Sequence, residues 1–380
     1  MRDLKILCAI TLAHFTVMGI YLSALPLFVT DALAGSRAAV GVAVGSFFIS
    51  ALVFRPPVGR ALDTWGRRPF LIAAPAVVAV SSFGLLAVDS IGGVIALRFF
   101  QGIAGATFYI AAVTIATDLA PQQRRAEVIT VFSLFLYGGI AAGPAVGEYL
   151  VRGGDFDRAW IVAGALAIGA SLAGLLLPET RTSAEKATRP LRFLHPASVS
   201  PGLVLMFAAT GYASITSFSP LYARAVGIGS SGPLYVLFAA SIVLVRLATR
   251  TLADRRGRIA VAFPGTVAAA AGMACLAIAQ PVTAYIGVAL YASGFALIFP
   301  ALMALTADRV PDAERGEAMG SFTAFFDVGA GAGSYAVGAL AAAFGFSVAF
   351  GVPAILCVIG ISILWRSRAE QGRTTNPGPG

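Results

Sequence analysis

The chain alternates long apolar runs with short polar or charged segments. Runs long enough to cross a bilayer core of about 30 Å fall into two groups of six. The first group covers residues 5–29, 39–58, 69–88, 91–117, 127–151 and 159–178, and the second covers 202–224, 231–252, 259–280, 282–307, 316–341 and 345–365. This pattern predicts an all-α membrane protein with 12 transmembrane helices, arranged as two six-helix bundles.

A polar, basic, proline-containing segment separates the two groups of runs. We therefore predict a first bundle at 1–180, a cytoplasmic linker at 181–200, a second bundle at 201–366 and a disordered cytoplasmic tail at 367–380. The first apolar run, Ile6 to Val29, exceeds the core of about 7–15 residues of a secretory signal. We expect it to be a retained first helix.

Composition supports a membrane location, because 58% of the residues are apolar, only 12% are charged and the mean hydropathy is +0.85. The net charge is +9, but the cations lie at the ends of apolar runs, which disfavours nucleic-acid binding. With a cytoplasmic N-terminus, 22 of the 27 Lys and Arg fall on the inner side, Arg55 and Arg246 included. This bias predicts that both termini are cytoplasmic, in a bacterial inner membrane.

Cofactor and metal chemistry find little support in the sequence. The three cysteines form no CxxC pair, the two histidines, His14 and His195, are far apart, and no acid-rich metal motif is present. A nucleophile–base pair and a glycine-rich ATP loop are also missing from the pattern. We expect no cofactor, no bound metal and no enzymatic activity.

An internal repeat relates the two groups of helices. Asp63 and Gly66 recur as Asp254 and Gly257, and DLAPQQRRAE at 118–127 matches DRVPDAERGE at 308–317. Two halves that repeat in the same orientation are typical of secondary transporters.

The loop between the second and third helices, GRALDTWGRR, resembles the best-known signature of the major facilitator superfamily, G-x-L-A-D-R-x-G-R-K. Ala61 and Thr64 depart from that signature. The resemblance implies a cytoplasmic gate in which the aspartate holds helix 2 against helix 11 and an arginine pairs with the acid ending helix 4. The alternative is that these residues are only topology charges and turn glycines. The gate residues so assigned are Gly59, Asp63, Gly66, Arg67, Arg68, Asp118, Asp254, Gly257 and Arg258.

Helix 5 carries GGIAAGPAVGE at 138–148, which resembles the signature of drug:proton antiporters. Thr130 and Glu148 stand where that signature has glycine. The resemblance implies export and a hinge in helix 5, whereas the alternative is a small-residue packing face. The hinge residues are Gly139, Gly143, Pro144 and Gly147.

Three ionisable residues within apolar runs are candidates for proton coupling. Asp327 lies ten residues past Glu317, about 15 Å into the bilayer core. It could carry a proton, bind a cationic substrate or be a hydrogen-bonded core residue. Arg98, in RFFQG, resembles the superfamily's second signature but could also snorkel to the surface. His14, at a depth similar to that of Asp327, could equally be a packing residue.

The resemblance also implies which helices line a central substrate cavity. On those helices we select Gln101, Tyr109, Tyr137, Tyr291 and Phe295. Some relatives carry an acid in helix 1 before an Ala-Leu-Pro triplet, but the residues before Ala24 contain none. We predict a monomer in the lipid bilayer that exports a lipophilic or amphipathic small molecule against proton entry by alternating access. The alternative is proton-coupled uptake of a sugar or other metabolite.

Overall fold

The protein was analysed as a computed structural model that describes residues 2–121, 125–181, 194–249, 252, 256–311 and 314–374. Side chains at 63, 125–127, 130, 315–316 and 367–374 lie outside the description. Within these residues the regular elements are helices, and no strand occurs. The prediction of an all-α fold is confirmed.

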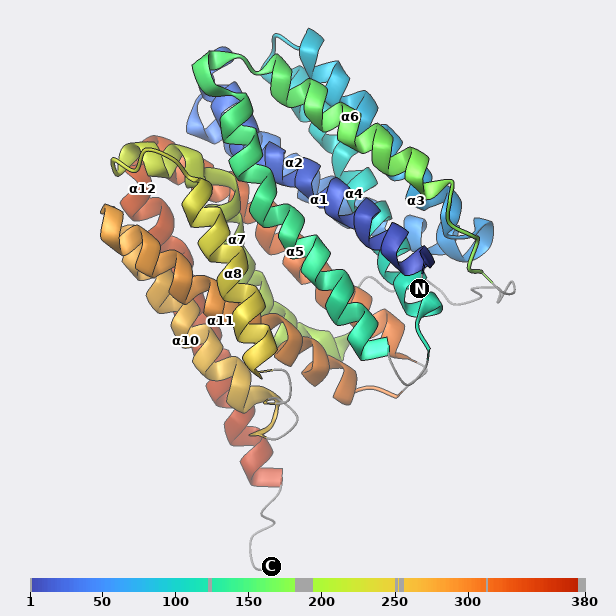
Figure 1. Cartoon of the computed structure of the whole chain (residues 1–380). Coiled ribbons are helices and arrows are strands. Elements are labelled where there is room, and N and C mark those ends of the chain that lie inside the picture. The colour runs from blue at the N-terminus through green and yellow to red at the C-terminus, as the bar shows by residue number, and fades with distance from the viewer. Residues whose placement is uncertain are drawn as a thin grey trace, which may run out of the picture.

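The N-terminal helices follow the apolar runs closely. α1 (Arg2–Leu27) is followed by a π-helical turn, Phe28–Ala32. The others are α2 (Arg37–Trp65), α3 (Arg68–Gly84), α4 (Ile91–Leu119), α5 (Arg125–Leu150) and α6 (Asp157–Gly174). Figure 1 shows them as the blue-to-green part of the molecule.

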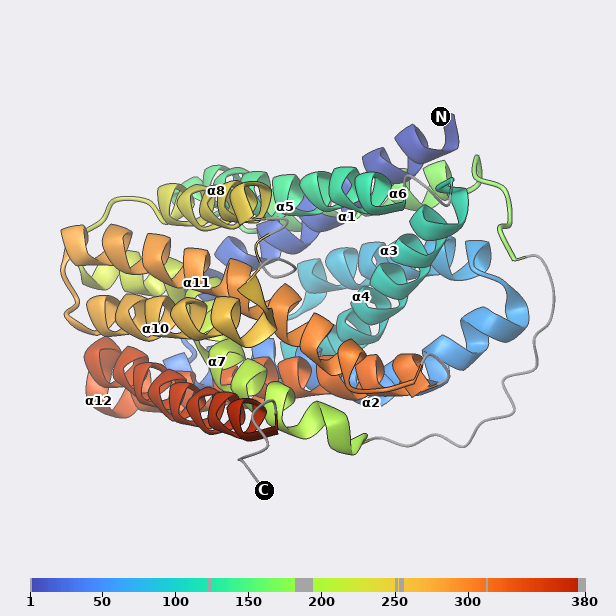
Figure 2. The ribbon, with the colours of Figure 1, turned by 90° about the horizontal axis from the view of Figure 1, so that it is seen from below.

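The C-terminal part contains α7 (Pro196–Ala225), α8 (Gly232–Thr249), α10 (Arg258–Ala277), α11 (Pro281–Asp308) and α12 (Arg315–Thr374). Two predicted runs, 316–341 and 345–365, merge into α12 because only Gly345 interrupts the helix, with a φ of 81°. This left-handed conformation costs glycine little, and the chain reverses direction there (Figure 2).

Ten described helices are long and apolar enough to cross a membrane, and the last of them, Glu317–Arg366, spans 50 residues. The start of α1 and the end of α12 lie on the same side of the molecule (Figure 1). The count of 12 spans and the cytoplasmic location of the termini remain predictions.

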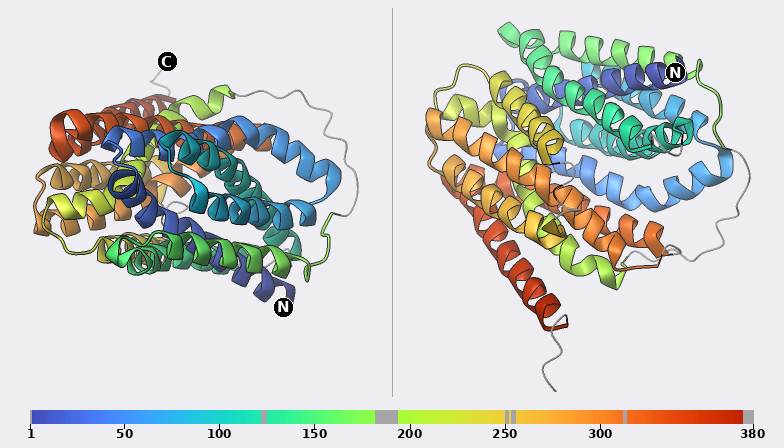
Figure 3. Two further views of the ribbon diagram at one scale, coloured as in Figure 1. Left: turned by 90° about the horizontal axis from the view of Figure 1, so that it is seen from above. Right: turned by 60° about the horizontal axis from the view of Figure 1, so that its bottom comes forward.

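The helices pack mostly within their own half of the chain. In the first half, α1 packs on α5 and α6, and α3 packs on α4 and α6. In the second half, α7 and α10 pack on α12, and α11 packs on α10 and α8. The halves meet mainly through α2 with α12, α5 with α8 and α1 with α7. The views in Figure 3 show the resulting bundle from two further directions.

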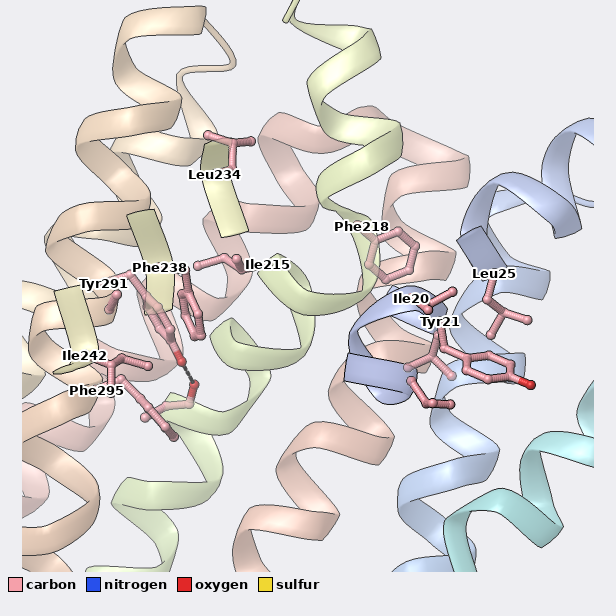
Figure 4. Packing of buried hydrophobic residues seen from close by; sticks show 14 of the residues in the cluster. Ile20, Tyr21, Leu25, Ile215, Phe218, Leu234, Phe238, Ile242, Tyr291 and Phe295 are labelled. Carbon is pink, nitrogen blue, oxygen red and sulfur yellow. Dashed lines mark hydrogen bonds between the residues drawn. The ribbon is translucent and has the colours of Figure 1, made fainter. Parts of the chain in front are cut away.

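One apolar core runs through both halves. Figure 4 shows Phe218 of α7 near Ile20 and Leu25 of α1, and Phe238 of α8 beside Tyr291 of α11. Other large apolar side chains point outward and are exposed by 65–73%: Val80, Leu244 and Phe344. A surface of this kind is stable only when lipid covers it.

Candidate functional site

Polar side chains from both halves meet between the helices. Tyr109 of α4 lies close enough to interact electrostatically with Tyr137 of α5, Arg55 of α2 and Arg246 of α8. Arg55 in turn pairs with Asp327 of α12. We call these five residues the inter-half cluster. Its members come from three helices of the first half and two of the second, so movement of the halves changes their contacts.

Arg55 and Asp327 form an ion pair that links the halves. Arg55 Nη2 lies 2.9 Å from Asp327 Oδ1 and 2.7 Å from Oδ2. The Asp327 side chain is 2% exposed and that of Arg55 is 22% exposed. Backbone contact between α2 and α12 explains the approach, because Gly41 and Gly45 lie directly against the facing helix.

The position of Arg55 corrects the sequence interpretation, which counted it with the inner loops. α2 continues to Trp65, so Arg55 lies ten residues, or about 15 Å, before the end of the helix. The apolar run used for the prediction ended at 58, because the two prolines and Arg60 lowered its hydropathy. The partner on α12 could be found only in the folded structure.

Arg246 lies in the last turn of α8 and contacts a residue of the other half. Its guanidinium carbon lies 4.9 Å from the centre of the Tyr137 ring, which belongs to the other half. Its Nε is buried and has no hydrogen-bond partner. Tyr109 is 40% exposed although it lies in the middle of α4. Neighbouring helices therefore cover only part of the Tyr109 side chain.

The predicted gate contains an ion pair in each half. Arg67 Nη1 contacts Asp118 Oδ2, and Arg258 Nε lies 3.1 Å from Asp308 Oδ2 at the equivalent place of the repeat. Each arginine directly follows a glycine with a positive φ, 94° at Gly66 and 90° at Gly257. The contact between Arg67 and the acid that ends α4 agrees with the sequence interpretation. Its gating role is untested.

For two further gate residues, Gly59 and Arg68, the described contacts do not reach the other half. Gly59 lies in α2 with open space around it, and Arg68 begins α3, where its Nη2 donates to the Leu175 carbonyl at 2.8 Å. The side chain of Asp63 and the whole of Asp254 lie outside the described residues.

Glu179 caps the start of α3, which the sequence analysis did not identify. Its carboxylate accepts from the backbone N–H groups of Arg67, Arg68, Thr180 and Arg181 at 2.9–3.1 Å. Partial burial raises the pKa of Glu179, but these four bonds outweigh it and hold the pKa below the ordinary value. The only sequence signal was an acid directly after the sixth apolar run.

Arg98, Gln101 and His14 lie within the first half, away from the inter-half cluster. Arg98 is 5% exposed and its Nη1 donates to Gln101 Oε1 at 2.9 Å. The Gln101 amide donates to the Tyr21 hydroxyl at 2.7 Å, so this residue is held in a buried network. His14 stacks on Phe108 with the ring centres 3.8 Å apart. The structure places none of these three beside Asp327.

Two of the selected aromatic residues are part of the packed core. Tyr291 is fully buried and its hydroxyl donates to the Ala208 carbonyl at 2.6 Å. Phe295 is 4% exposed and packs with Tyr212 and Phe326, whose ring centres lie 5.5 and 6.2 Å away. These rings pack on Phe326, the residue before Asp327 in α12, whereas Tyr109 and Tyr137 belong to the inter-half cluster itself.

The glycines of helix 5 form a contact face for α1. Gly139 and Gly143 lie against the α1 backbone around Thr16 and Gly19, and Gly147 lies against Ser23. Pro144 is part of the same face, since its ring contacts Gly19. α5 is nevertheless described as one helix over its whole length. These contacts show that the glycine face of α5 packs on α1. A hinge in α5 is still only a proposal.

The outer ends of the two halves are joined by polar contacts. Arg224 Nη1 of α7 lies 2.7 Å from Asp31 Oδ2, which follows α1. Glu148 of α5 accepts from the Ser231 backbone N–H at 2.7 Å and contacts the Ser230 hydroxyl, at the start of α8. A cavity of about 270 Å³ lies among these residues. Within the described residues, no group of three or more His, Cys, Asp or Glu could hold a metal ion.

Comparison of the sequence with known families gives one clear match. The sequence profile of the Major Facilitator Superfamily matches residues 7–306, with a second match at 252–379. An uncharacterized MFS-type transporter of Burkholderia mallei (strain SAVP1) is 28% identical over 384 residues, which are 97% of this chain and 92% of the relative. Another from Salmonella typhimurium is 28% identical over 370 residues, 95% of each chain.

Solved transporter structures share the fold. A variant of the nucleoside transporter NupG has a TM-score of 0.76 at 17% identity, covering 96% of this chain and 99% of that one. The human organic anion transporter MFSD10 has a TM-score of 0.73 at 17% identity, with the same coverage. A bacterial homolog of the human lysosomal transporter Spinster, inward-facing and occupied, has a TM-score of 0.75 at 16% identity, covering 97% and 96%.

Proposed function

We propose that this chain, which belongs to the Major Facilitator Superfamily, is a proton-coupled secondary transporter of an amphipathic small molecule. It works by alternating access in the inner membrane, and the inter-half cluster is its proton and substrate site. The observation that carries the proposal is the ion pair between Arg55 and Asp327, because it joins the two moving halves through a buried carboxylate.

Protonation of Asp327 weakens the contact between the two halves and so allows them to move apart. A proton on the carboxylate removes its charge and therefore the ion pair with Arg55. The charged group that faces Asp327 from α2 is Arg55, and α7 and α11 present the rings of Tyr212 and Phe295 around the neighbouring Phe326. With so few competing charges, the protonation state of Asp327 controls this contact between the halves.

Two directions of coupling follow from different observations. The Gly-Pro face of α5 favours export in exchange for a proton, because it resembles the drug:proton antiporter signature. The charge of the inter-half cluster favours co-transport, because protonation of Asp327 leaves two arginines uncompensated and attracts an anion. Co-transport also exports a substrate when the cell accumulates it.

Purified protein in liposomes loaded with a pH-sensitive dye tests the proposal. Amphipathic probes of positive, neutral and negative charge are added under an imposed proton gradient. We expect one class to drive proton movement, inward for co-transport and outward for exchange when the probe enters. Asp327→Asn should abolish that proton movement while probe exchange across the membrane continues, because its side chain no longer titrates.

The control is Asp155→Asn, which alters an exposed carboxylate paired with Arg158. This variant should move protons like the wild type. Substrate transport without proton movement in the wild type, or full proton movement in Asp327→Asn, would contradict the proposed coupling.

A further inference from the structure

The inter-half cluster has an excess of positive charge. Arg55 and Arg246 contribute two cations and Asp327 contributes one anion, which is already paired with Arg55. In the described part of the chain, Arg246 has no carboxylate within ion-pair distance.

Arg246 has a donor that no described group accepts. Its guanidinium carbon lies 4.9 Å from the centre of the Tyr137 ring, within the range of a cation–π contact. Nε is buried and has no partner, although a buried donor without a hydrogen bond is costly. The edge formed by Nε and one Nη matches the two oxygens of a planar carboxylate.

Next to this edge lie groups suited to the rest of an organic acid. The Tyr109 hydroxyl is within electrostatic reach of the two arginines, and Tyr109 is 40% exposed. The rings of Phe295 and Tyr212 pack on Phe326, the residue that precedes Asp327 in α12. A ligand with one anionic end and an apolar ring therefore fits both the charge and the surface, whereas a cation would meet repulsion.

We propose that the substrate is an amphipathic organic monoanion and that Arg246 binds its carboxylate or sulfonate. The inference rests on the proposed transport function and specifies the substrate class of the same site. It selects co-transport over exchange, because the anion and the proton on Asp327 each favour binding of the other. It also agrees with the lack of an acid before Ala24 in helix 1.

Binding by the full-length protein in detergent tests the substrate class separately from transport. The probes are naphthoate, phenylbutyrate and naphthalenesulfonate, each compared by calorimetry with its neutral amide and a cationic amine of the same ring. We expect at least one anion to bind while its amide and amine do not. Arg246→Gln should weaken that binding at least about tenfold, as for a lost charge-assisted hydrogen bond.

Three further variants separate a binding role from a structural one. Arg246→Lys keeps the positive charge but lacks the paired N–H donors of the guanidinium. Its affinity for the anion should therefore lie between those of Arg246→Gln and the wild type. Asp327→Asn should strengthen anion binding, because it frees Arg55 from its partner. Arg366→Gln removes an exposed cation at the end of the last span and should leave binding unchanged.

The outcomes distinguish the two proposals. The proposal that Arg246 binds an anionic substrate is overturned if no anionic probe binds, or if anion binding survives Arg246→Gln. Anion binding that depends on Arg246, without proton-linked transport of that anion in liposomes, supports the binding site and overturns the proposed function.

Discussion

At the scale of single residues, the Arg55–Asp327 pair shows how much depends on one contact. A carboxylate that is 2% exposed is stable as a charge only beside a partner. Removing one member of such a buried pair typically costs about 3–5 kcal/mol, because the other charge remains uncompensated. Protonation avoids that cost, since a neutral carboxyl group needs no counter-ion. Charged Asp327 can therefore stabilise the state in which the halves are joined at this point, and protonated Asp327 can permit the state in which they separate.

Glu179 acts at the same scale, at the start of α3. A carboxylate whose pKa is lowered in the fold stabilises it above the ordinary glutamate pKa and loses this effect as the pH falls through the lowered value. Glu179→Gln should therefore unfold at a lower temperature than the wild type at neutral pH, by about 1 kcal/mol of stability, as for a lost helix cap. Thermal unfolding in detergent measures the difference.

The difference between wild type and Glu179→Gln should shrink as the solution becomes acidic, because the wild-type carboxylate is then protonated as well. Glu314→Gln provides a control, since this exposed carboxylate contacts only the His195 ring among the described residues. A difference that does not change with pH would show that Glu179 does not act through its charge.

At the scale of helices, the paired glycines decide which elements lie together. α5 meets α1 at Gly143 and Gly19, and α2 meets α12 at Gly41 and Gly45, so two backbones touch where a larger side chain would separate them. The sequence showed the small residues of α5 but not the partner helix. For α2, Gly41 and Gly45 have the G-x-x-x-G spacing of a close helix contact, but this spacing does not identify the partner helix.

Gly143→Leu should separate α5 from α1. The added side chain meets the α1 backbone at Gly19 and Thr16, so it forces a shift that typically costs about 1–3 kcal/mol. We expect a lower melting temperature in detergent. Gly169→Leu is the matched control, because α6 has open space around Gly169. Equal melting temperatures of the two variants would mean that α1 and α5 can move apart without loss of stability.

At the scale of the whole molecule, contacts between the halves are found at the outer ends and in the middle. Asp31 with Arg224 and Glu148 with Ser231 join the outer ends, and Arg55 with Asp327 joins the middle. The ion pairs at Arg67 and Arg258 instead lie within their own halves. The contacts of Asp31 and Glu148 hold the halves together at the end that the predicted topology places outside.

Alternating access requires the outer contacts to separate. Asp31→Cys with Arg224→Cys, in a background without the native cysteines, allows a short bifunctional thiol reagent to join the halves. Cross-linking should abolish transport, and a cleavable reagent should restore it on reduction. The control pair, Asp155→Cys with Arg158→Cys, lies within one half and should not affect transport. Full transport by the cross-linked first pair would exclude separation at this point.

The sequence by itself determined the class, the helices and the repeat. Apolar length and charge at helix ends are properties of local segments in a bilayer, so they can be predicted without knowing which helices touch. The family resemblance implied the pairing of Arg67 with Asp118, and the repeat aligned Asp118 with Asp308, whereas the pairing of Arg258 with Asp308 was found in the structure.

Only the tertiary structure decided the membership of the inter-half cluster. Arg55 and Asp327 are 272 positions apart, and Arg246 meets Tyr137 across the boundary between the halves. In the sequence both arginines could be assigned to span ends by the topology rule, which holds whether or not an arginine has a partner, so their local sequence cannot reveal one. The same applies to Gln101 and Tyr291, which lie on expected helices but point into hydrogen-bonded or packed surroundings. Helix rotation and packing decide that direction, because they depend on contacts between distant segments.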